Sequence, residues 1–139
     1  MDVVIDANEL FSCIIAYGKG LNNKTIDIFF DGRIKLHAPT KLLEELKNNE
    51  EELAQKSGLS VSEYEVFLAI LKLRICFVPL DEFGAKLHEA EPLMPHLKDI
   101  EYFALALKLN AKLWSQEKAF KKQTRIETVS TNDLFDMLK

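Results

Sequence analysis

The chain has 139 residues, so we expect residues 1–139 to form a single domain that buries a sizeable core. Hydrophobic residues make up 47% and charged residues 29% of the sequence, the balance of an ordinary water-soluble globular protein. The formal net charge of −4 argues against a protein that holds nucleic acid through its overall charge, although it leaves room for a local basic patch.

The first part of the chain contains two predicted strands, each followed by a helix. The first strand, Val3–Ile5, is an apolar run that ends at Asp6, and the stretch through Ile15 behind it is interpreted as a buried helix. The second strand, Ile34–His37, precedes a predicted helix over 40–56. One face of that helix is apolar because leucines recur at helical spacing, at Leu42, Leu43, Leu46 and Leu53.

The remaining predicted elements alternate in the same way. Ser60 and Glu63 form a capping-box pattern that opens a helix through Leu73, and a third strand follows at Ile75–Val78. Asp99–Asn110 is apolar over most of its circumference, so we expect a buried helix there. Two further strands and a short helix complete the pattern, namely Ala111–Trp114, Glu127–Val129 and a helix capped by Thr131 or Asn132 that ends near Leu138.

This alternation of strands and helices predicts the fold class. Strands that alternate with helical segments are typical of α/β proteins with a mainly parallel sheet. With the strands named above, the pattern predicts a three-layer α/β/α sandwich, in which helices cover both faces of a five-stranded sheet.

The cysteines and the N-terminal segment bear on the compartment. Cys13 and Cys76 lie inside apolar runs without a CxxC spacing, so we expect buried, reduced thiols. The sequence begins directly with a strand-like run and lacks the basic-then-apolar pattern of a signal peptide. No apolar stretch approaches the length that spans a bilayer, and we therefore expect a cytoplasmic protein with no membrane association.

Acidic residues follow several of the predicted strands. Asp6 comes directly after the first strand, Glu44 and Glu45 lie in the helix after the second, Asp99 begins the buried helix, and Glu117 follows the fourth strand. Because the carboxyl ends of parallel strands share one edge of a sheet, we expect these carboxylates to converge there. Each acid alone also has an ordinary explanation, a helix cap for Asp6 or Asp99 and a solvated surface residue for the others.

Such a cluster predicts a divalent cation. Carboxylates that lie close together raise one another's pKa, and a bound cation relieves that repulsion. Hard ions such as Mg2+ and Mn2+ prefer oxygen ligands, and a water that they hold can attack a phosphodiester. Asn8 and Ser115 are predicted supporting residues, because each can hydrogen-bond to a neighbouring acid or to a water at the same edge.

Three segments together resemble the motifs of PIN-domain proteins. "VVIDANELFSCII" resembles the opening motif, in which a strand runs into Asp-x-Asn/Thr and a helix. "APTKLLEEL" resembles the second motif, where the acid directly before a leucine favours Glu45 over Glu44. "KDIEYFALALKLNAKLWSQEKAF" resembles the third and fourth motifs, and the ordered set spans nearly the whole chain.

The resemblance implies a parallel sheet between helices and a nuclease that depends on Mg2+ or Mn2+ and usually cleaves RNA. By position in the motifs, Asp6, Glu45 and Asp99 match the metal-binding acids, and Asn8 matches the polar partner of the first. Many small bacterial and archaeal members are toxins paired with an antitoxin, and many dimerise. The resemblance therefore also implies an antitoxin-type protein partner and a homodimer.

The fourth motif departs from the family's common Ser-Asn-Asp-Lys-Asp-Phe. The chain reads here Ser115, Gln116, Glu117, Lys118, Ala119 and Phe120. Glu117 keeps the acid's charge with one more methylene, Ala119 lacks the following carboxylate, and His96 stands where related members often have an aspartate. Two functions follow as alternatives, a metal-dependent endoribonuclease or a catalytically degraded PIN domain that binds RNA or protein.

The endoribonuclease interpretation assigns catalysis and metal binding to four acids, namely Asp6, Glu45, Asp99 and Glu117. Basic residues close behind the fourth motif are then candidates to hold RNA phosphates, namely Lys118, Lys121, Lys122 and Arg125. The alternative for these basic residues is a solvated loop.

Overall fold

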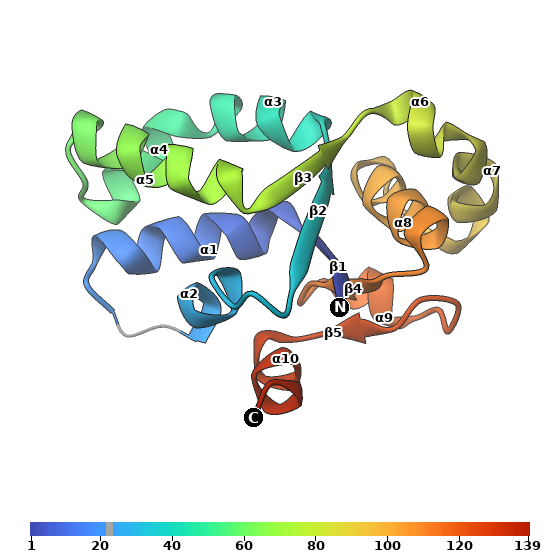
Figure 1. Ribbon diagram of the computed structural model, residues 1–139. Coiled ribbons are helices and arrows are strands. Elements are labelled where there is room, and N and C mark those ends of the chain that lie inside the picture. Colours follow the sequence, from blue (N-terminus) through green and yellow to red (C-terminus); the bar gives the residue numbers. More distant parts are fainter. Residues whose placement is uncertain (22–23) are drawn as a thin grey trace.

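The structure is a computed structural model that describes residues 1–21 and 24–139. Its strands form one parallel sheet in the order β3-β2-β1-β4-β5 (Figure 1). The strands are β1 Asp2–Ile5, β2 Lys35–Pro39, β3 Ile75–Val78, β4 Lys112–Trp114 and β5 Thr128–Val129. In the register of the sheet, Val4 on β1 lies between His37 on β2 and Leu113 on β4. The predicted five-stranded sheet is confirmed. The sequence predicted a mainly parallel sheet, and in the structure the described strand pairs are all parallel.

Helices cover both faces of the sheet, which confirms the predicted α/β class (Figure 1). On one side lie α1 Ala7–Gly18, α2 Lys24–Phe29, α4 Glu50–Ser57, α5 Val61–Leu73 and α10 Thr131–Met137. On the other side lie α6 Leu80–Phe83, α7 Leu87–Ala90 and α8 Leu97–Leu109, and the last of these contacts β1, β2 and β4. Short helices follow β2 and β4 at the carboxyl end of the sheet, namely α3 Lys41–Asn48 and α9 Lys118–Lys121.

The helix boundaries follow the local sequence. The capping box predicted at Ser60 is confirmed, because its hydroxyl accepts a hydrogen bond from the Glu63 backbone and the Glu63 side chain returns one. The predicted cap of the last helix is wrong by one residue. Ser130, rather than Thr131 or Asn132, caps α10, since it forms the same reciprocal pair with Asp133.

The predicted helix over 40–56 is interrupted at Asn49. The backbone of Asn49 leaves the helical conformation, and its side-chain amide donates a hydrogen bond of 2.7 Å to the Glu45 carbonyl. Leu42 and Leu46 are buried in α3, whereas Leu43 is 38% exposed, so the predicted apolar stripe is wrong at Leu43. The physical reason is that α3 is a separate two-turn helix, and Leu43 points about 100° away from the buried leucine before it.

The two thiols differ in their surroundings. Cys13 is buried in α1, as expected, but Cys76 is exposed. Cys76 lies on β3, one of the two edge strands of the described sheet, where β2 is its neighbouring strand. The apolar run around Cys76 therefore does not imply a fully covered strand. Trp114, at the end of β4, is fully buried and lies in the core.

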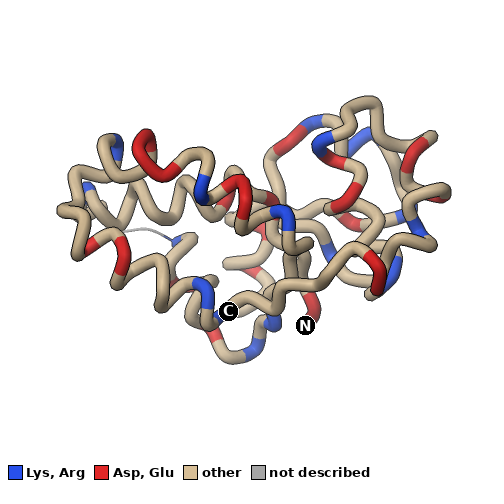
Figure 2. The backbone as a smooth tube through the Cα atoms, turned by 90° about the horizontal axis from the view of Figure 1, so that it is seen from above, with Lys and Arg blue, Asp and Glu red and all other residues tan. Residues whose placement is uncertain are grey.

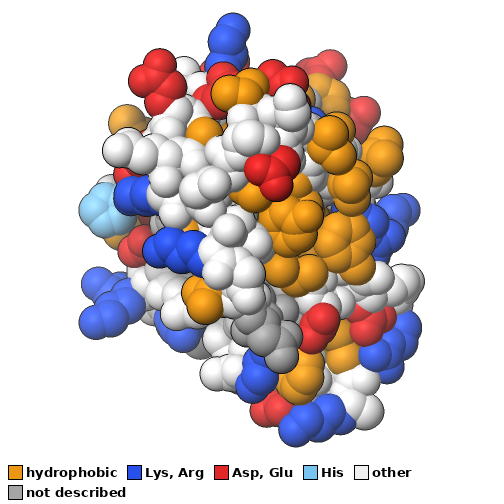
Figure 3. All heavy atoms as spheres, turned by 90° about the vertical axis from the view of Figure 1, so that its left-hand side faces the viewer, with side chains coloured by type: hydrophobic (Ala, Val, Ile, Leu, Met, Phe, Trp, Pro, Cys, Tyr) orange, Lys and Arg blue, Asp and Glu red, His pale blue; other side chains and the backbone are white. Residues whose placement is uncertain are grey.

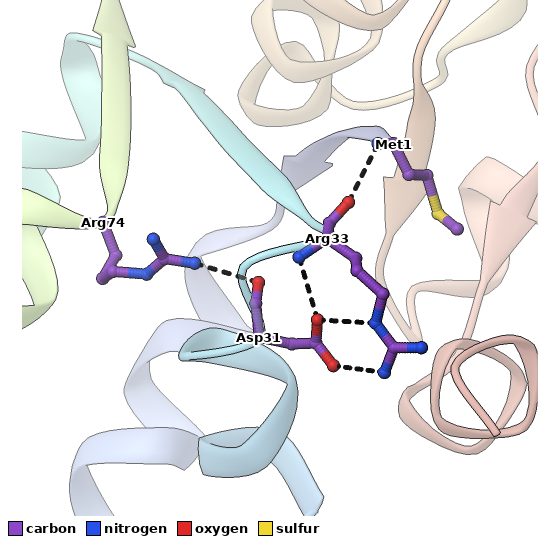
Figure 4. A network of polar contacts seen from close by, with 4 residues as sticks. All are labelled: Met1, Asp31, Arg33 and Arg74. Atoms are coloured by element: carbon purple, nitrogen blue, oxygen red, sulfur yellow. Dashed lines mark hydrogen bonds and ion pairs between the residues drawn. The ribbon is translucent and has the colours of Figure 1, made fainter.

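The amino ends of the strands are joined by a polar network (Figure 4). Arg33 forms a two-pronged ion pair with Asp31, with nitrogen–oxygen distances of 3.0 and 2.7 Å. Arg74, at the start of β3, donates to the Asp31 carbonyl at 3.0 Å, and the Met1 ammonium donates to the Arg33 carbonyl at 2.9 Å. Hydrogen bonds from Arg33 lower the pKa of Asp31 to about 2. This network lies at the opposite end of the sheet from the acids described below.

None of the helices in the described ranges, 1–21 and 24–139, is long and apolar enough to cross a bilayer.

Candidate active site

Asp6 lies at the carboxyl end of the central strand. Its backbone N–H donates to the Trp114 carbonyl at 3.1 Å, which ties the end of β1 to the end of β4. The residue occupies the N-cap position of α1, yet within the described chain its side chain makes no capping hydrogen bond. The carboxylate instead accepts a hydrogen bond of 2.7 Å from the Ser115 hydroxyl, and it is only 7% exposed. The hydrogen bond to Ser115, at the end of another strand, is a role that helix capping does not account for.

The pKa of Asp6 is raised above its ordinary value because the carboxyl group is buried. The Ser115 hydroxyl and the backbone amides of Asn8 and Ala7 oppose this rise, and the negative charge of Glu117 adds to it. The two predicted supporting residues, Ser115 and Asn8, therefore contact Asp6 in different ways. Ser115 touches Asp6 through its side chain, whereas Asn8 acts through its backbone and its side chain is exposed.

Glu45 reaches the same edge from α3. The Tyr102 hydroxyl donates to its carboxylate oxygen Oε1 at 3.0 Å, and the Lys41 ammonium lies 3.9 Å from the same oxygen. Burial raises the pKa of Glu45, the contacts with Tyr102 and Lys41 lower it, and the charge of Asp6 raises it again. Glu44 is exposed, so Glu45 is the acid of this pair that lies beside Asp6.

Asp99 lies in the first turn of α8, three residues after the N-cap residue His96. Asp99 is 5% exposed, and its oxygen Oδ2 is buried without a hydrogen-bond partner among the residues that the structure describes. Burial raises the pKa of Asp99. The charges of Asp6 and Glu117 raise it further, while Lys98 and His96 oppose the rise. His96, and not this aspartate, is the N-cap residue of α8, so capping does not account for the burial of the Asp99 carboxylate.

Glu117 follows β4 and precedes α9. Its backbone N–H donates to the Ser115 hydroxyl oxygen at 2.9 Å, so one serine links Glu117 to Asp6. The side chain is half-buried, and its charge raises the pKa of both Asp6 and Asp99. The structure therefore brings Glu45, Asp99 and Glu117, but not Glu44, within electrostatic reach of Asp6. Figure 2, which looks down on the carboxyl ends of the strands, shows acidic segments from both helical layers around the middle of the molecule.

The donor set suits a hard cation, because it consists of carboxylate oxygens and includes the unpartnered oxygen of Asp99. In the described part of the chain, no three acidic, histidine or cysteine side chains are already arranged as the ligands of a metal ion. The carboxylates therefore lie close enough to repel one another, without yet forming a set of ligands around a single point.

Sequence reasoning missed a further carboxylate, Glu9. It lies one turn after Asp6 in α1 and is 5% exposed, and both burial and the charge of Asp6 raise its pKa. Thr131 donates to Glu9 Oε2 at 3.4 Å, and Trp114 Nε1 donates to the Thr131 hydroxyl oxygen at 3.1 Å. The available signal was the spacing of three residues, which places Glu9 on the same side of the helix as Asp6.

The basic residues behind the fourth motif are exposed, namely Lys118, Lys121, Lys122 and Arg125. Lys118 and Lys121 belong to α9, which starts directly after Glu117. Arg125 is engaged in an ion pair of 3.1 Å with Glu89 on α7, so part of its charge is already compensated. Ala119, which stands where the family has a further acid, is buried and packs inward.

Comparison with known proteins gives a family and a fold. A family model described as PIN domain matches residues 4–134. Among solved structures, a chain of VapBC2 from Rickettsia felis, crystallised bound to a DNA fragment from its promoter, is similar with a TM-score of 0.62 and 16% identity. The alignment covers 94% of this chain and 98% of that one. At this identity the likeness shows the fold. No curated protein matches the sequence.

Proposed function

The chain belongs to the PIN-domain family, and from that premise we propose that it is an endoribonuclease that hydrolyses RNA phosphodiester bonds with the help of Mg2+ or Mn2+. The observation that carries this proposal is the buried oxygen Oδ2 of Asp99, which has no hydrogen-bond partner among the described residues and whose carboxylate is repelled by that of Asp6. Two buried, mutually repelling carboxylates with a free oxygen are an unfavourable arrangement unless a cation joins them.

Asp6, Glu45, Asp99 and Glu117 are the residues that would hold the cation. A hard divalent ion at this edge would stabilise the negative charge that develops on a phosphodiester and would acidify a water. The chain's own contribution is to bury the carboxylates and to fix their positions. Ser115 holds Asp6, and Tyr102 holds Glu45.

RNA would approach along the exposed lysines of α9 and the loop behind it. Lys118 follows Glu117 directly, and Lys122 is the residue that follows the same short helix. Lysines bind phosphates through their charge and do not recognise particular bases, so these residues would hold the RNA backbone near the acids. Arg125 would have to leave Glu89 before it could bind a phosphate with its full charge.

Cleavage of a mixed RNA pool in the presence of Mn2+ tests the proposal. The wild type is compared with Asp6→Asn and Asp99→Asn, with Asp81→Asn as a matched control because Asp81 is an exposed aspartate on α6. We expect cleavage by the wild type and by Asp81→Asn, and at least ~100-fold slower cleavage by the other two variants, a loss typical of removing a group that stabilises charge during the reaction. Equal, slow degradation by all of the proteins would favour the alternative, a PIN domain that only binds RNA or protein.

A partner protein is proposed for the face formed by Tyr17, Val66, Phe67 and Ile70, the α1–α5 face. Tyr17 and Phe67 stack with ring centres 3.7 Å apart, and the four residues line a hollow of about 280 Å3. Val66 is 62% exposed and Ile70 is 44% exposed. Figure 3 shows hydrophobic side chains gathered on this side of the molecule. Exposed apolar surface of this kind marks interaction sites.

The resemblance to PIN-domain proteins implies an antitoxin-type partner, and we propose this face for it because exposed apolar side chains gather here. Light scattering of the purified chain and of Val66→Glu tests the assignment. A monomeric wild type that binds a co-expressed candidate antitoxin, together with loss of that complex in Val66→Glu, would support it. A wild-type homodimer that becomes monomeric in Val66→Glu would instead assign the face to a second copy of the chain.

A further inference from the structure

Lys41 joins two helices that carry acids of the candidate site. It is the first residue of α3, and its ammonium donates a hydrogen bond of 2.7 Å to the carbonyl oxygen of Lys98 on α8. That carbonyl belongs to the peptide bond between Lys98 and Asp99. The Lys41 side chain therefore holds the backbone from which the Asp99 carboxylate projects.

The same ammonium lies beside the second acid. It is 3.9 Å from Glu45 Oε1, the oxygen that also accepts the hydrogen bond from Tyr102, and 4.0 Å from Glu101 Oε2. The Tyr102 ring centre lies 5.2 Å from the ammonium, within cation–π range. The Lys41 ammonium thus contacts α8 through the Lys98 carbonyl, the Tyr102 ring and the Glu101 carboxylate, and it contacts Glu45 on its own helix, α3.

This arrangement differs from an ordinary surface ion pair. The Lys41 side chain is 21% exposed, whereas Lys56 and Glu52, an i,i+4 pair on α4, are 56% and 57% exposed. Exposed pairs of the second kind contribute little to stability. Lys41 instead makes a hydrogen bond to a backbone carbonyl 57 residues away, so its geometry constrains two segments that are far apart in the sequence.

We propose that Lys41 is a positioning residue that sets the placement of the Glu45 and Asp99 carboxylates before a cation binds. The inference rests on the proposed function, because the cation would bind between acids that α3 and α8 deliver separately. Groups that orient ligands without contacting the metal affect its affinity strongly, since misplaced ligands must be reordered when the metal binds.

Calorimetric titration with Mn2+ tests the proposal in Lys41→Met, Lys41→Arg and the control Lys56→Met. We expect Lys41→Met to bind Mn2+ at least ~10-fold more weakly than the wild type, the range seen when a residue that orients ligands is lost. Lys41→Arg keeps the charge and the donors and should recover most of this affinity, and Lys56→Met should match the wild type. Affinity in Lys41→Met that equals or exceeds the wild-type value overturns the proposal, because Lys41 would then merely compete with the cation.

Hydrogen exchange in the metal-free proteins separates this inference from the proposed function. We expect the amides of residues 99–103 to exchange faster in Lys41→Met than in the wild type, and to exchange at the wild-type rate in Lys56→Met. If the wild type binds no Mn2+, the proposed function fails, while faster exchange at 99–103 still supports the positioning role. Unchanged exchange of these amides in Lys41→Met overturns the positioning role, whether or not the wild type binds Mn2+.

Discussion

Ser115 donates its hydroxyl hydrogen to the buried carboxylate of Asp6 at 2.7 Å, although the two residues are 109 positions apart in the chain. The same hydroxyl oxygen accepts the backbone N–H of Glu117. A single side chain therefore connects the acid after β1 with the acid after β4. This connection is possible because β1 and β4 are neighbours in the sheet and both end at the same edge.

Replacement of Ser115 by alanine should impair the site without unfolding the protein. The Ser115 hydrogen bond lowers the pKa of Asp6, so its loss should raise that pKa further and move the acid limb of the pH–cleavage profile to higher pH. We also expect ~10-fold weaker Mn2+ binding, as for other groups that orient a ligand. Ser62→Ala, at an exposed position on α5, is the control. An unchanged pH profile in Ser115→Ala would contradict this role.

The buried carboxylates should make the metal-free protein less stable as the pH rises. Burial raises the pKa of Asp6 and Asp99, so the folded chain holds protons that the unfolded chain releases above its ordinary carboxyl pKa. The favourable contribution is present at low pH and is lost as the pH rises through the raised pKa values. Chemical denaturation from about pH 4 to pH 7 should therefore show that Asp6→Asn gains stability relative to the wild type.

Addition of Mn2+ should make the wild type more stable than Asp6→Asn, the reverse of the order expected without metal. At a concentration ~100-fold above its dissociation constant, a ligand that binds only the folded state stabilises it by about 2.7 kcal/mol. Mn2+ should therefore stabilise the wild type at neutral pH and leave Asp6→Asn nearly unchanged. A stability difference between these two proteins that does not vary with pH would show that the Asp6 carboxylate is not the group that titrates.

Much of the fold could be predicted because the signals were local. β1 and β3 are short apolar runs, and the Ser60 capping box marks the start of α5 as the sequence indicated. The region 79–96 could not be predicted, since its helices α6 and α7 are too short for a repeated apolar face. Exposure at Cys76 depends on β3 being the edge strand, and strand order is a property of the whole sheet.

The candidate site was predictable in part for the same reason. Asp6 follows β1 directly and Glu117 lies three residues after the end of β4, so a parallel sheet places both at one edge. Glu9 was missed because its spacing of three residues from Asp6 does not by itself distinguish a buried helical glutamate from a solvated one. Its hydrogen-bond partner Thr131 lies 122 positions away in the chain. The Lys41 contact with α8 is likewise a product of tertiary packing.

A close approach of two helices predicts the effect of a glycine substitution. Gly18 ends α1 beside Ser57 at the end of α4, and a Cβ atom on Gly18 would lie 2.2 Å from the Ser57 carbonyl oxygen. Because the Ser57 oxygen belongs to the backbone and cannot turn aside as a flexible side chain could, Gly18→Ala should destabilise the fold by roughly 1–3 kcal/mol, as other overpacked sites do. Gly32→Ala is the control, since a Cβ there meets nothing within 4 Å. Equal unfolding midpoints for the two variants would contradict the close contact.

The two cysteines should react at very different rates. Burial raises the pKa of the Cys13 thiol to about 12, which leaves almost no thiolate at neutral pH, whereas Cys76 is exposed at the sheet edge. A disulfide reagent should therefore modify one thiol rapidly in the native protein and both in concentrated guanidinium chloride. Cys76→Ser should abolish the rapid phase. Rapid modification that persists in Cys76→Ser would mean that α1 opens readily.

The central claim is that Asp6 and Asp99 share one divalent cation. Anomalous diffraction from a crystal of the wild-type protein soaked in Mn2+ tests it most directly. We predict an anomalous peak at the carboxyl edge of the sheet, in contact with oxygens of both Asp6 and Asp99 and absent from a soaked crystal of Asp99→Asn. A soaked wild-type crystal whose only Mn2+ peaks lie away from this edge would contradict the account.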